Sequence, residues 1–267
     1  MAGSDRGTEA GRYAVVSRPL TSAAARGWRR RWDVQQSLGV GNREERFDAM
    51  MDAIAAGVPT RFRFLDLGTG TGSLTERILR RFPRSRGVAL DFDPILLKIA
   101  RTGLGEVGGR VRWVDADLRR RSWTRALPPG LFDLVVSSTA LHWLSGGEVR
   151  GLYGALARRL RREGLFLNAD GLAYPPSAPT LRRVARSMGR GASRGGFRAW
   201  DAWWLAVERD PRFASEVVLR RHRYPHTHLG TATPDLEGHV RRLRAAGFRE
   251  VEVLWSRGQN RVLAAIR

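Results

Sequence analysis

Three glycines at alternate positions follow a short apolar run, and they constrain the fold of this chain more than any other feature. The run at 64–67 predicts a buried strand, and a helix is expected to open at Ser73. Between them stand Gly68, Gly70 and Gly72. A strand, a glycine turn and a helix N-terminus form the usual cradle for a nucleotide-like ligand, because free backbone N–H groups meet there. The chain is therefore expected to fold as an α/β domain with a ligand site at this turn.

Asp66 lies just ahead of the glycines and decides which ligand the turn favours. The dinucleotide fingerprint G-x-G-x-x-G holds a pyrophosphate on the helix N-terminus, and a nearby carboxylate would repel it. Here the spacing is G-x-G-x-G and the acid is built in. The favoured ligand therefore carries a cation beside its adenosine. S-adenosylmethionine (SAM), with an α-ammonium and a sulfonium, fits this requirement.

The composition bounds the class of protein. At 267 residues and 42% hydrophobic content, the chain is long enough for one full α/β core. No apolar run approaches the roughly 18 residues of a membrane span, and the lack of cysteine excludes disulfides and zinc–thiolate sites. We expect a cytoplasmic protein without membrane contact. Residues 1–25 lack the apolar region of a secretory signal and are expected to form a flexible N-terminus.

A formal charge of +21 raises the question of a nucleic-acid partner. Lys98 is the single lysine, and the arginines are spread along the whole chain. Dispersed charge is usually a solvated surface, and Arg in place of Lys is also what a GC-rich coding sequence produces. Nucleic acid is therefore the less favoured partner, although nonspecific affinity for polyanions at low salt is expected.

Strands and helices alternate after the glycine turn. Strands are expected at 61–67, 87–90, 111–114, 132–137 and 164–168, and helices at 73–82, 94–100 and 149–160. This alternation predicts βαβ units and a parallel sheet. A helix at 236–246 and strands at 248–255 and 261–266 add a closing hairpin. The expected fold is therefore α/β, a Rossmann-like, seven-stranded, mostly parallel sheet with a C-terminal antiparallel hairpin strand.

The remaining segments flank or interrupt this core. The predicted organisation is a helical segment at 26–60 over the cofactor cleft, a core at 61–170 and 236–267, and an inserted, mainly helical lid at 171–235. The first segment breaks near residues 39–42, and its residues Trp28, Trp32 and Gln36 are spaced to present one face either to the cleft or to the sheet. The insertion enters on the side where open α/β sheets bind ligands, so it is expected to recognise the substrate.

The insertion is rich in tryptophan and histidine. Trp200, Trp203 and Trp204, at helical spacing, are either core residues or contacts to the substrate. His222, His226 and His228 have no accompanying carboxylate, and neighbouring arginines oppose a cation, so no metal site is expected.

Two further acids follow predicted strands. Asp91 lies 19 positions past Gly72, where a carboxylate is placed to accept hydrogen bonds from both hydroxyls of a ribose. Asp93 stands directly before Pro94 and is the better candidate for a helix N-cap. After the third strand, Asp117 is expected to accept the adenine amino group, with Asp115 as its competitor.

These segments resemble class I SAM-dependent methyltransferases. They are Asp66-Leu-Gly-Thr-Gly-Thr-Gly72, the strand-end Asp91, Ala116-Asp117-Leu118, and the run Phe132–Leu144. The fourth segment and residues 156–167 are similar to the small-molecule branch that includes trans-aconitate and biotin-pathway methyltransferases. The resemblance covers about residues 44–170. It implies SAM as cofactor, S-adenosylhomocysteine (SAH) as product, and the cofactor-binding residues Asp66, Gly68, Thr69, Gly70, Gly72, Asp91, Phe92, Asp117, Leu118 and Ser137.

The chemistry that the resemblance implies needs few protein groups. A methyl on a sulfonium is already a good electrophile, so the enzyme mainly positions a nucleophile and excludes water. A base is required only for a poorly acidic hydroxyl or an ammonium. His142, on the loop after the fourth strand, is either that base or a packing residue. The candidate substrate contacts are His142, Trp143, Trp200 and Trp204.

Three functions remain open from the sequence. The favoured one is methyl transfer to an oxygen or nitrogen of a small molecule, in specialised metabolism. Methyl or carboxymethyl transfer to a tRNA nucleoside is the alternative that the charge favours. A SAM-binding regulator without turnover is the third, and a homodimer is left open for each.

Overall fold

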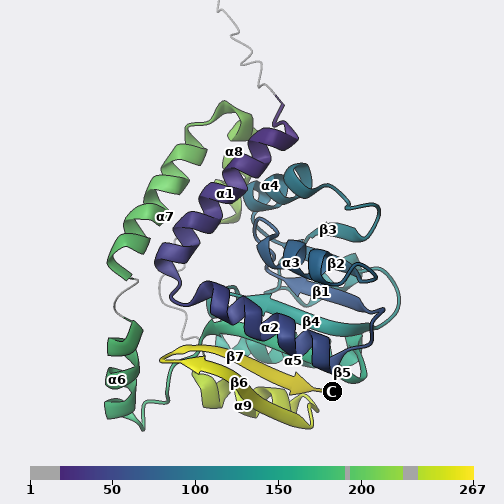
Figure 1. Cartoon of the computed structure of the whole chain (residues 1–267), viewed down its shortest axis with the longest axis vertical. Helices are drawn as coiled ribbons and strands as arrows, with labels where there is room; N and C mark the ends of the chain where they lie inside the picture. The colour runs from purple at the N-terminus through teal and green to yellow at the C-terminus, as the bar shows by residue number, and fades with distance from the viewer. Residues whose placement is uncertain (1–18, 190–192, 225–233) are drawn as a thin grey trace, which may run out of the picture.

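A single seven-stranded sheet forms the centre of the computed structural model, which describes residues 19–189, 193–224 and 234–267 (Figure 1). Its strands are β1 (Arg63–Leu67), β2 (Arg86–Asp91), β3 (Val111–Asp115), β4 (Phe132–Ser138), β5 (Leu160–Gly171), β6 (Glu250–Arg257) and β7 (Asn260–Ile266). The α-helices are α1 (Ser22–Gly39), α2 (Arg43–Gly57), α3 (Ser73–Arg81), α4 (Pro94–Leu104), α5 (Gly146–Arg159), α6 (Pro179–Gly189), α7 (Ser193–Glu208), α8 (Ala214–Arg223) and α9 (Leu236–Ala245). Short 3₁₀ turns are η1 (Arg121–Ala126), η2 (Leu141–Trp143) and η3 (Pro211–Phe213).

The strand order is β3-β2-β1-β4-β5-β7-β6. The first five strands are parallel, and β7 lies antiparallel between β5 and β6. This confirms the predicted Rossmann-like sheet and its closing hairpin. The order reverses between β1 and β4, and in such sheets ligands bind at the carboxyl ends of the strands beside that reversal.

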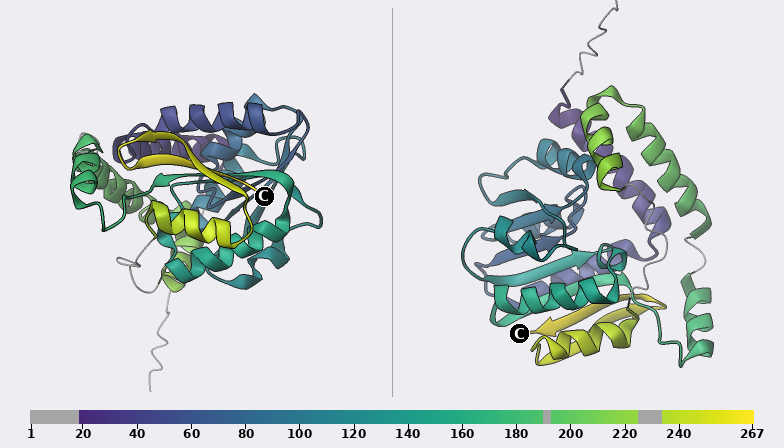
Figure 2. Two further views of the ribbon diagram at one scale, coloured as in Figure 1. Left: turned by 90° about the horizontal axis from the view of Figure 1, so that it is seen from below. Right: turned by 180° about the vertical axis from the view of Figure 1, so that it is seen from behind.

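The sheet is buried on both faces, which explains why its central strands read as continuous apolar runs. On one face Leu65 and Val135 belong to a core that includes α5 and α9. On the other, Phe64 and Leu134 pack with apolar residues of α2 and α3. Figure 2 shows the resulting three layers, with α2 above the sheet and α5 and α9 below it. The rigid sheet fixes the strand ends that carry the site.

A third core joins α1 to the insertion. Trp28 and Trp32 of α1 pack against Trp203 of α7, with ring centroids 5.7 and 4.8 Å apart, and against apolar residues of α4. Trp200 and Trp204 are partly buried in the same cluster. The prediction that the Trp28–Trp32 face meets the cleft or the sheet is therefore wrong, because tryptophans 170 residues further along the chain cover it. α1 and α7 lie side by side in Figure 1.

Two predicted boundaries also differ from the structure. α1 begins at Ser22, where the Thr21 hydroxyl accepts from the N–H of Ala24, so a flexible N-terminus extending to residue 25 is too long. β5 is also longer than predicted, since it continues to Gly171 through pairing with β7. The predicted break at 39–42 is confirmed, with Asn42 at φ 57°.

The insertion at 171–235 is mainly helical where it is described, as predicted. It comprises α6, α7, η3 and α8, and α7 packs along α1. His226 and His228 lie outside the described residues. No helix in the described ranges combines the length and apolar character needed to cross a bilayer.

Replacing Trp203 with alanine tests the third core. Its side chain is 3% exposed, and its removal is expected to lower the free energy of unfolding by about 3–5 kcal/mol in urea titrations followed by circular dichroism. Phe197→Ala on the same helix is the matched control, because Phe197 is 75% exposed and its loss should change stability by less than about 0.5 kcal/mol. Equal effects of the two substitutions would contradict the packing of α7 on α1.

Candidate functional site

The glycine turn adopts a backbone that favours glycine at each of its three positions. Gly68, Gly70 and Gly72 have φ of 67°, 58° and 85°. A Cβ on Gly68 would lie 2.4 Å from the Ala140 side chain, whereas a Cβ on Gly70 would meet nothing within 4 Å. Gly70 therefore borders open space at the ends of β1 and β2, where a ligand can approach the backbone closely.

Asp66 lies under this turn and stabilises it through hydrogen bonds. It is 1% exposed, and its Oδ2 accepts hydrogen bonds from the hydroxyls of Thr69 (2.8 Å) and Thr75 (2.6 Å). Burial raises the pKa of Asp66 to about 6, and the two hydroxyls oppose that rise. The carboxylate thus links the turn to helix α3 and places a negative charge under the site.

Asp91 ends β2 and faces the same turn. Its Oδ2 accepts from the N–H of Gly70 at 2.7 Å, and its Oδ1 accepts from the N–H of Asp93 at 2.8 Å. Burial raises the pKa of Asp91 to about 7, and the charge of Asp93 adds to the rise. Asp93 itself caps α4 through Ile95 and Leu96, which confirms its predicted N-cap role. Asp91 is therefore not needed as the N-cap of α4, and its carboxylate can accept hydrogen bonds from a ligand.

The acids after β3 are both paired with arginine. Asp117 accepts from the side chain of Arg119 at 2.8 and 3.0 Å, and Asp115 accepts from Arg223 of α8 at 2.9 and 2.8 Å. Both guanidinium groups lie within 5 Å of the Phe92 ring centre. Contact of Asp117 with an adenine amino group stays a prediction, since an incoming donor would share the carboxylate with Arg119. The insertion contributes Arg223, and the pairing of this arginine with Asp115 was not predicted.

The side chains of two predicted cofactor-binding residues, Ser137 and Leu118, make contacts within the protein. The Ser137 hydroxyl is buried and donates to the carbonyl of Leu67 at 2.9 Å, which joins the ends of β4 and β1. Leu118 packs against the core below the sheet. Any contact of either residue with the cofactor stays a prediction.

A histidine–aspartate pair lies beyond the end of β4 and at the end of β5. Nδ1 of His142 lies 2.9 Å from Oδ1 of Asp170, and the backbone N–H of His142 donates to Oδ2 of Asp170 at 3.2 Å. Burial lowers the pKa of His142, but the adjacent carboxylate outweighs it and the net shift is upward. Burial raises the pKa of Asp170, yet His142, the N–H of Gly171 and Arg46 hold it at about 2. Asp170 therefore orients the imidazole of His142.

Asp170 was missed in the sequence analysis, although a signal existed. Like Asp91, it is a carboxylate at the end of a central strand, but the predicted fifth strand stopped at residue 168. Trp143, next to His142, is 49% exposed, and its ring centre lies 5.0 Å from that of His142. Trp143 is therefore accessible to solvent, whereas Trp200 and Trp204 are partly buried in the α1–α7 core. A substrate contact of any of the three stays a prediction.

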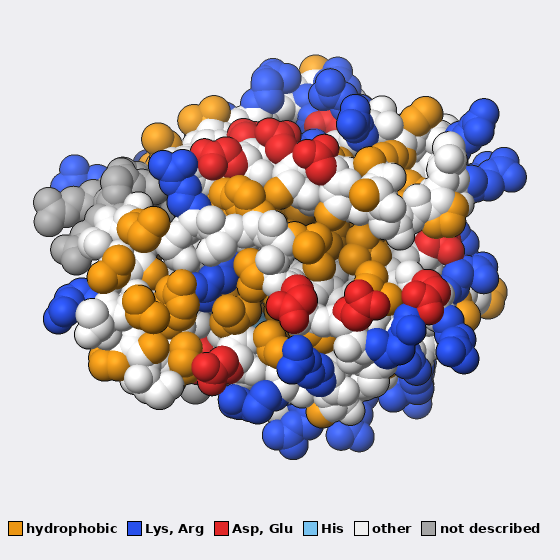
Figure 3. All heavy atoms as spheres, turned by 60° about the horizontal axis from the view of Figure 1, so that its bottom comes forward, with side chains coloured by type: hydrophobic (Ala, Val, Ile, Leu, Met, Phe, Trp, Pro, Cys, Tyr) orange, Lys and Arg blue, Asp and Glu red, His pale blue; other side chains and the backbone are white. Residues whose placement is uncertain are grey.

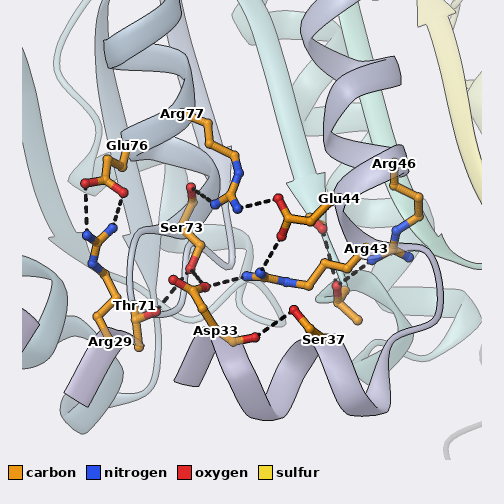
Figure 4. Close-up of polar contacts among 12 residues, drawn as sticks. Arg29, Asp33, Ser37, Arg43, Glu44, Arg46, Thr71, Ser73, Glu76 and Arg77 are labelled. Atoms are coloured by element: carbon orange, nitrogen blue, oxygen red, sulfur yellow. Dashed lines mark hydrogen bonds and ion pairs between the residues drawn. The ribbon is translucent and has the colours of Figure 1, made fainter. Parts of the chain in front are cut away.

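Helices α1 and α2 meet the start of α3 through ion pairs (Figure 4). Asp33 of α1 accepts from the hydroxyl of Ser73 at 2.6 Å and from Arg43 of α2 at 2.7 Å. Arg29 and Glu76 form a second pair between α1 and α3. These contacts fix both helices beside the glycine turn, and none of them was predicted.

Arg46, one turn beyond Arg43 on α2, is fully buried. Its Nη2 donates to the Thr139 hydroxyl at 3.2 Å, while its Nε and Nη1 have no hydrogen-bond partner among the described residues. Burial lowers the pKa of Arg46 to about 10; Asp170 opposes this and Arg43 adds to it. The guanidinium remains charged at neutral pH. The sequence shows only that Arg46 lies three positions from Arg43 on the same helical face, and its burial comes from the structure.

Metal ligation finds no support in the part of the chain that the structure describes, where no three His, Cys, Asp or Glu side chains are grouped to hold an ion. His222 is exposed on α8 and adjoins arginines on both sides. The chemistry of the site is therefore argued from its acids, its histidine and its arginines.

A family model and the curated relatives that this chain resembles are all methyltransferases. Residues 64–164 match the family model described as a methyltransferase domain. The chain is 28% identical over 151 residues to malonyl-[acyl-carrier protein] O-methyltransferase of Paenibacillus sp., covering 56% of this chain and 52% of that protein. It is 36% identical over 118 residues to trans-aconitate 2-methyltransferase of Streptomyces avermitilis, covering 43% and 42%. The chain thus spans about half the length of these curated relatives.

Solved structures share the fold at low identity. An O-methyltransferase family protein from Burkholderia thailandensis matches with a TM-score of 0.57 at 19% identity, over 93% of this chain and 63% of that one. Human N-acetylserotonin methyltransferase, solved with SAM, matches with a TM-score of 0.53 at 15% identity, over 92% and 56%. The open turn at Gly70 and the strand-end carboxylate of Asp91 fit SAM in this fold.

Asp91→Asn is expected to weaken SAM binding by at least about tenfold, because ribose hydroxyls would donate to the ionised carboxylate. With the pKa of Asp91 near 7 and that of Asp66 near 6, wild-type affinity should rise as pH increases from 6 to 8. The variant should lose most of that rise above pH 7. Isothermal titration calorimetry with SAH measures both effects.

Asp115→Asn is the matched control, since Asp115 ends the neighbouring strand and pairs with Arg223. Its SAH affinity should stay within about threefold of wild type. Retained affinity and retained pH dependence in Asp91→Asn would refute the assignment of Asp91 to the cofactor.

Proposed function

The chain contains a class I SAM-dependent methyltransferase domain, and we propose that it transfers a methyl group from SAM to an oxygen or nitrogen of a small-molecule acceptor. The observation that carries this proposal is the open glycine turn with the Asp91 carboxylate across it. When bound, SAM supplies a methyl group on a sulfonium that needs no further activation. The residues of this chain have to bind it, orient the acceptor and exclude water.

The cofactor is assigned to the carboxyl ends of β1, β2 and β3. When SAM binds, Asp91 would accept from the ribose hydroxyls, Phe92 would contact the adenine, and the charge of Asp66 would favour the cationic end. This placement leaves the ends of β4 and β5 for the acceptor.

His142 acts as the general base in this proposal, and Asp170 is its positioning residue. With Nδ1 directed to Asp170, Nε2 is the ring nitrogen that removes the acceptor proton. Trp143, exposed beside it, contributes an apolar surface to the acceptor. The acceptor thereby lies between the bound cofactor and the His142 ring.

A small-molecule acceptor is favoured over tRNA. Acidic side chains lie between the basic ones on the face drawn in Figure 3, and arginines such as Arg161, Arg249 and Arg257 pair with acids. Such a surface does not form one continuous basic track. Residues 171–235 are proposed to determine specificity, and α8 already contacts Phe92 through Arg223. The proposal includes a role in specialised metabolism and a cytoplasmic location.

The function is tested with radiolabelled SAM against a panel of phenols, amines, carboxylic acids and bulk tRNA. Transfer to at least one small molecule is expected, and activity should be insensitive to 0.5 M salt. Transfer to tRNA alone would favour the tRNA alternative. SAH binding without transfer to any class would favour the regulator.

Substitution of the histidine–aspartate pair tests the base. His142→Gln should lower kcat by about 10²-fold or more. Wild-type kcat should rise with pH above 6.5, because the carboxylate raises the pKa of His142 and the base must be neutral. Asp170→Asn should lower kcat and move that rise to lower pH. His222→Gln, on the exposed face of α8, is the control, and a similar loss there would argue against a specific role for His142.

A further inference from the structure

Helix α6 carries an apolar stripe that the described part of the molecule leaves uncovered. Leu181, Val184 and Met188 are 54%, 49% and 61% exposed. Their spacing of i, i+3 and i+7 places them on one side of the helix. The neighbouring Ala185 is buried where α6 meets Gly258 at the turn between β6 and β7. α6 is thus attached to the core at one edge of its apolar side and exposes the rest.

The remaining surface of α6 is basic. Arg182, Arg183 and Arg186 form no ion pair within the described ranges. The sequence around them is also free of acids, because residues 171–200 contain arginine at six positions and neither aspartate nor glutamate. Elsewhere on the surface many arginines pair with acids, as at Arg249. The positive charge at α6 is therefore not compensated by the described part of the protein.

The position of α6 makes this face accessible. Figures 1 and 2 show the helix at the outer edge of the molecule, apart from the central layers. Hydrophobic side chains gather at the left of Figure 3, the side on which α6 lies in Figure 1. Strand β6, which α6 contacts, is at the edge of the sheet and exposes Leu254 to 56%. An extended surface can therefore approach α6 from outside.

An uncovered apolar stripe beside uncompensated arginines fits an anionic lipid surface. Aliphatic side chains enter the boundary between headgroups and acyl chains, while arginines stay at the level of the phosphates. Nucleic acid would match the charge alone, because single strands stack on aromatic side chains and α6 offers only aliphatic ones. A second copy of the chain would match the apolar stripe alone, since the arginines of the two helices would repel each other.

We propose that the exposed face of α6 binds the anionic surface of a lipid membrane and holds the protein there peripherally. The sequence analysis expected no membrane contact because it considered only a spanning segment. An interfacial helix needs only one apolar face with cations beside it. This inference goes beyond the proposed reaction and does not depend on the identity of the methyl acceptor.

Sedimentation of the full chain with lipid vesicles tests the proposal. At 0.1 M salt, wild type should partition about tenfold or more in favour of vesicles of equal phosphatidylglycerol and phosphatidylcholine over phosphatidylcholine alone. The difference should shrink at 0.5 M salt, because the charges are then screened.

The apolar stripe is tested by replacing Val184 and Met188 together with glutamine. This pair of substitutions should lower partitioning into the anionic vesicles about tenfold or more, since less apolar surface is buried in the interface. The matched control replaces Val218 and Leu219 of α8, which are 68% and 39% exposed in the same insertion. The control should stay within about twofold of wild type.

The charge is tested by replacing Arg183 and Arg186 together with glutamine. Partitioning should again fall about tenfold or more, because each arginine near an anionic surface strengthens binding about fivefold. The control replaces the exposed Arg80 and Arg81 of α3, which lowers the net charge by the same amount. It should stay within about twofold of wild type.

The lack of cysteine in the chain permits a direct measurement of insertion. A nitrobenzoxadiazole dye attached at Met188→Cys should shift its emission to shorter wavelength when anionic vesicles are added. The same dye at Val218→Cys should not respond. All the glutamine variants replace exposed side chains and should keep the Tm of wild type within about 2 °C. If one of them does not, the labelled cysteines decide the question.

Several results would overturn the proposal. They include failure of wild type to sediment with the anionic vesicles, equal losses from the α6 and control pairs, and equal dye responses at the two positions. A dimer in light scattering that dissociates when Val184 and Met188 are replaced would make the stripe a contact between copies. Loss of binding to a labelled RNA when Arg183 and Arg186 are replaced, with vesicle binding unchanged, would assign the helix to nucleic acid.

Discussion

Five parallel strands end at one edge of the sheet, and the rest of the site depends on that constraint. Asp91 and Asp170 lie at the ends of β2 and β5, on opposite sides of the reversal between β1 and β4. Side chains 79 positions apart in the sequence therefore lie at the same edge of the sheet. The glycine turn fits the same edge because Asp66, below it, is bound by two threonine hydroxyls. Burial of this carboxylate fixes the turn before any ligand arrives.

Aspartate has different properties at the two positions, the end of β2 and the end of β5. Asp91 accepts only backbone N–H groups, and burial raises its pKa to about 7. Asp170 is more deeply buried than Asp91, yet the adjacent His142 contributes to holding its pKa at about 2. A carboxylate without a cation is prepared to accept hydroxyl donors from a ligand, whereas one paired with imidazole is committed to orienting it. This difference in environment supports the proposed roles, with Asp91 binding the cofactor and Asp170 orienting His142.

The fold was predictable from the sequence to a greater extent than the site. Alternating strands and helices, the glycine turn and the hairpin each leave a local pattern, and all were found where expected. The contacts of Trp28 and Trp32 were not predictable, because α7 covers them from far along the chain and helical spacing does not name the partner. Asp170 was missed because pairing with β7 extends β5 beyond its apolar run.

The environment of a charged residue is likewise difficult to predict from the sequence. In the sequence Arg43 and Arg46 are two of many arginines, and their spacing shows only that they share a helical face. The structure separates them, since Arg43 pairs with Asp33, while two nitrogens of the buried Arg46 have no hydrogen-bond partner within the described ranges. An excess of positive charge on a surface says little about function, because solvent compensates it. A single buried guanidinium is more informative, because burial removes the solvent that would otherwise compensate its charge.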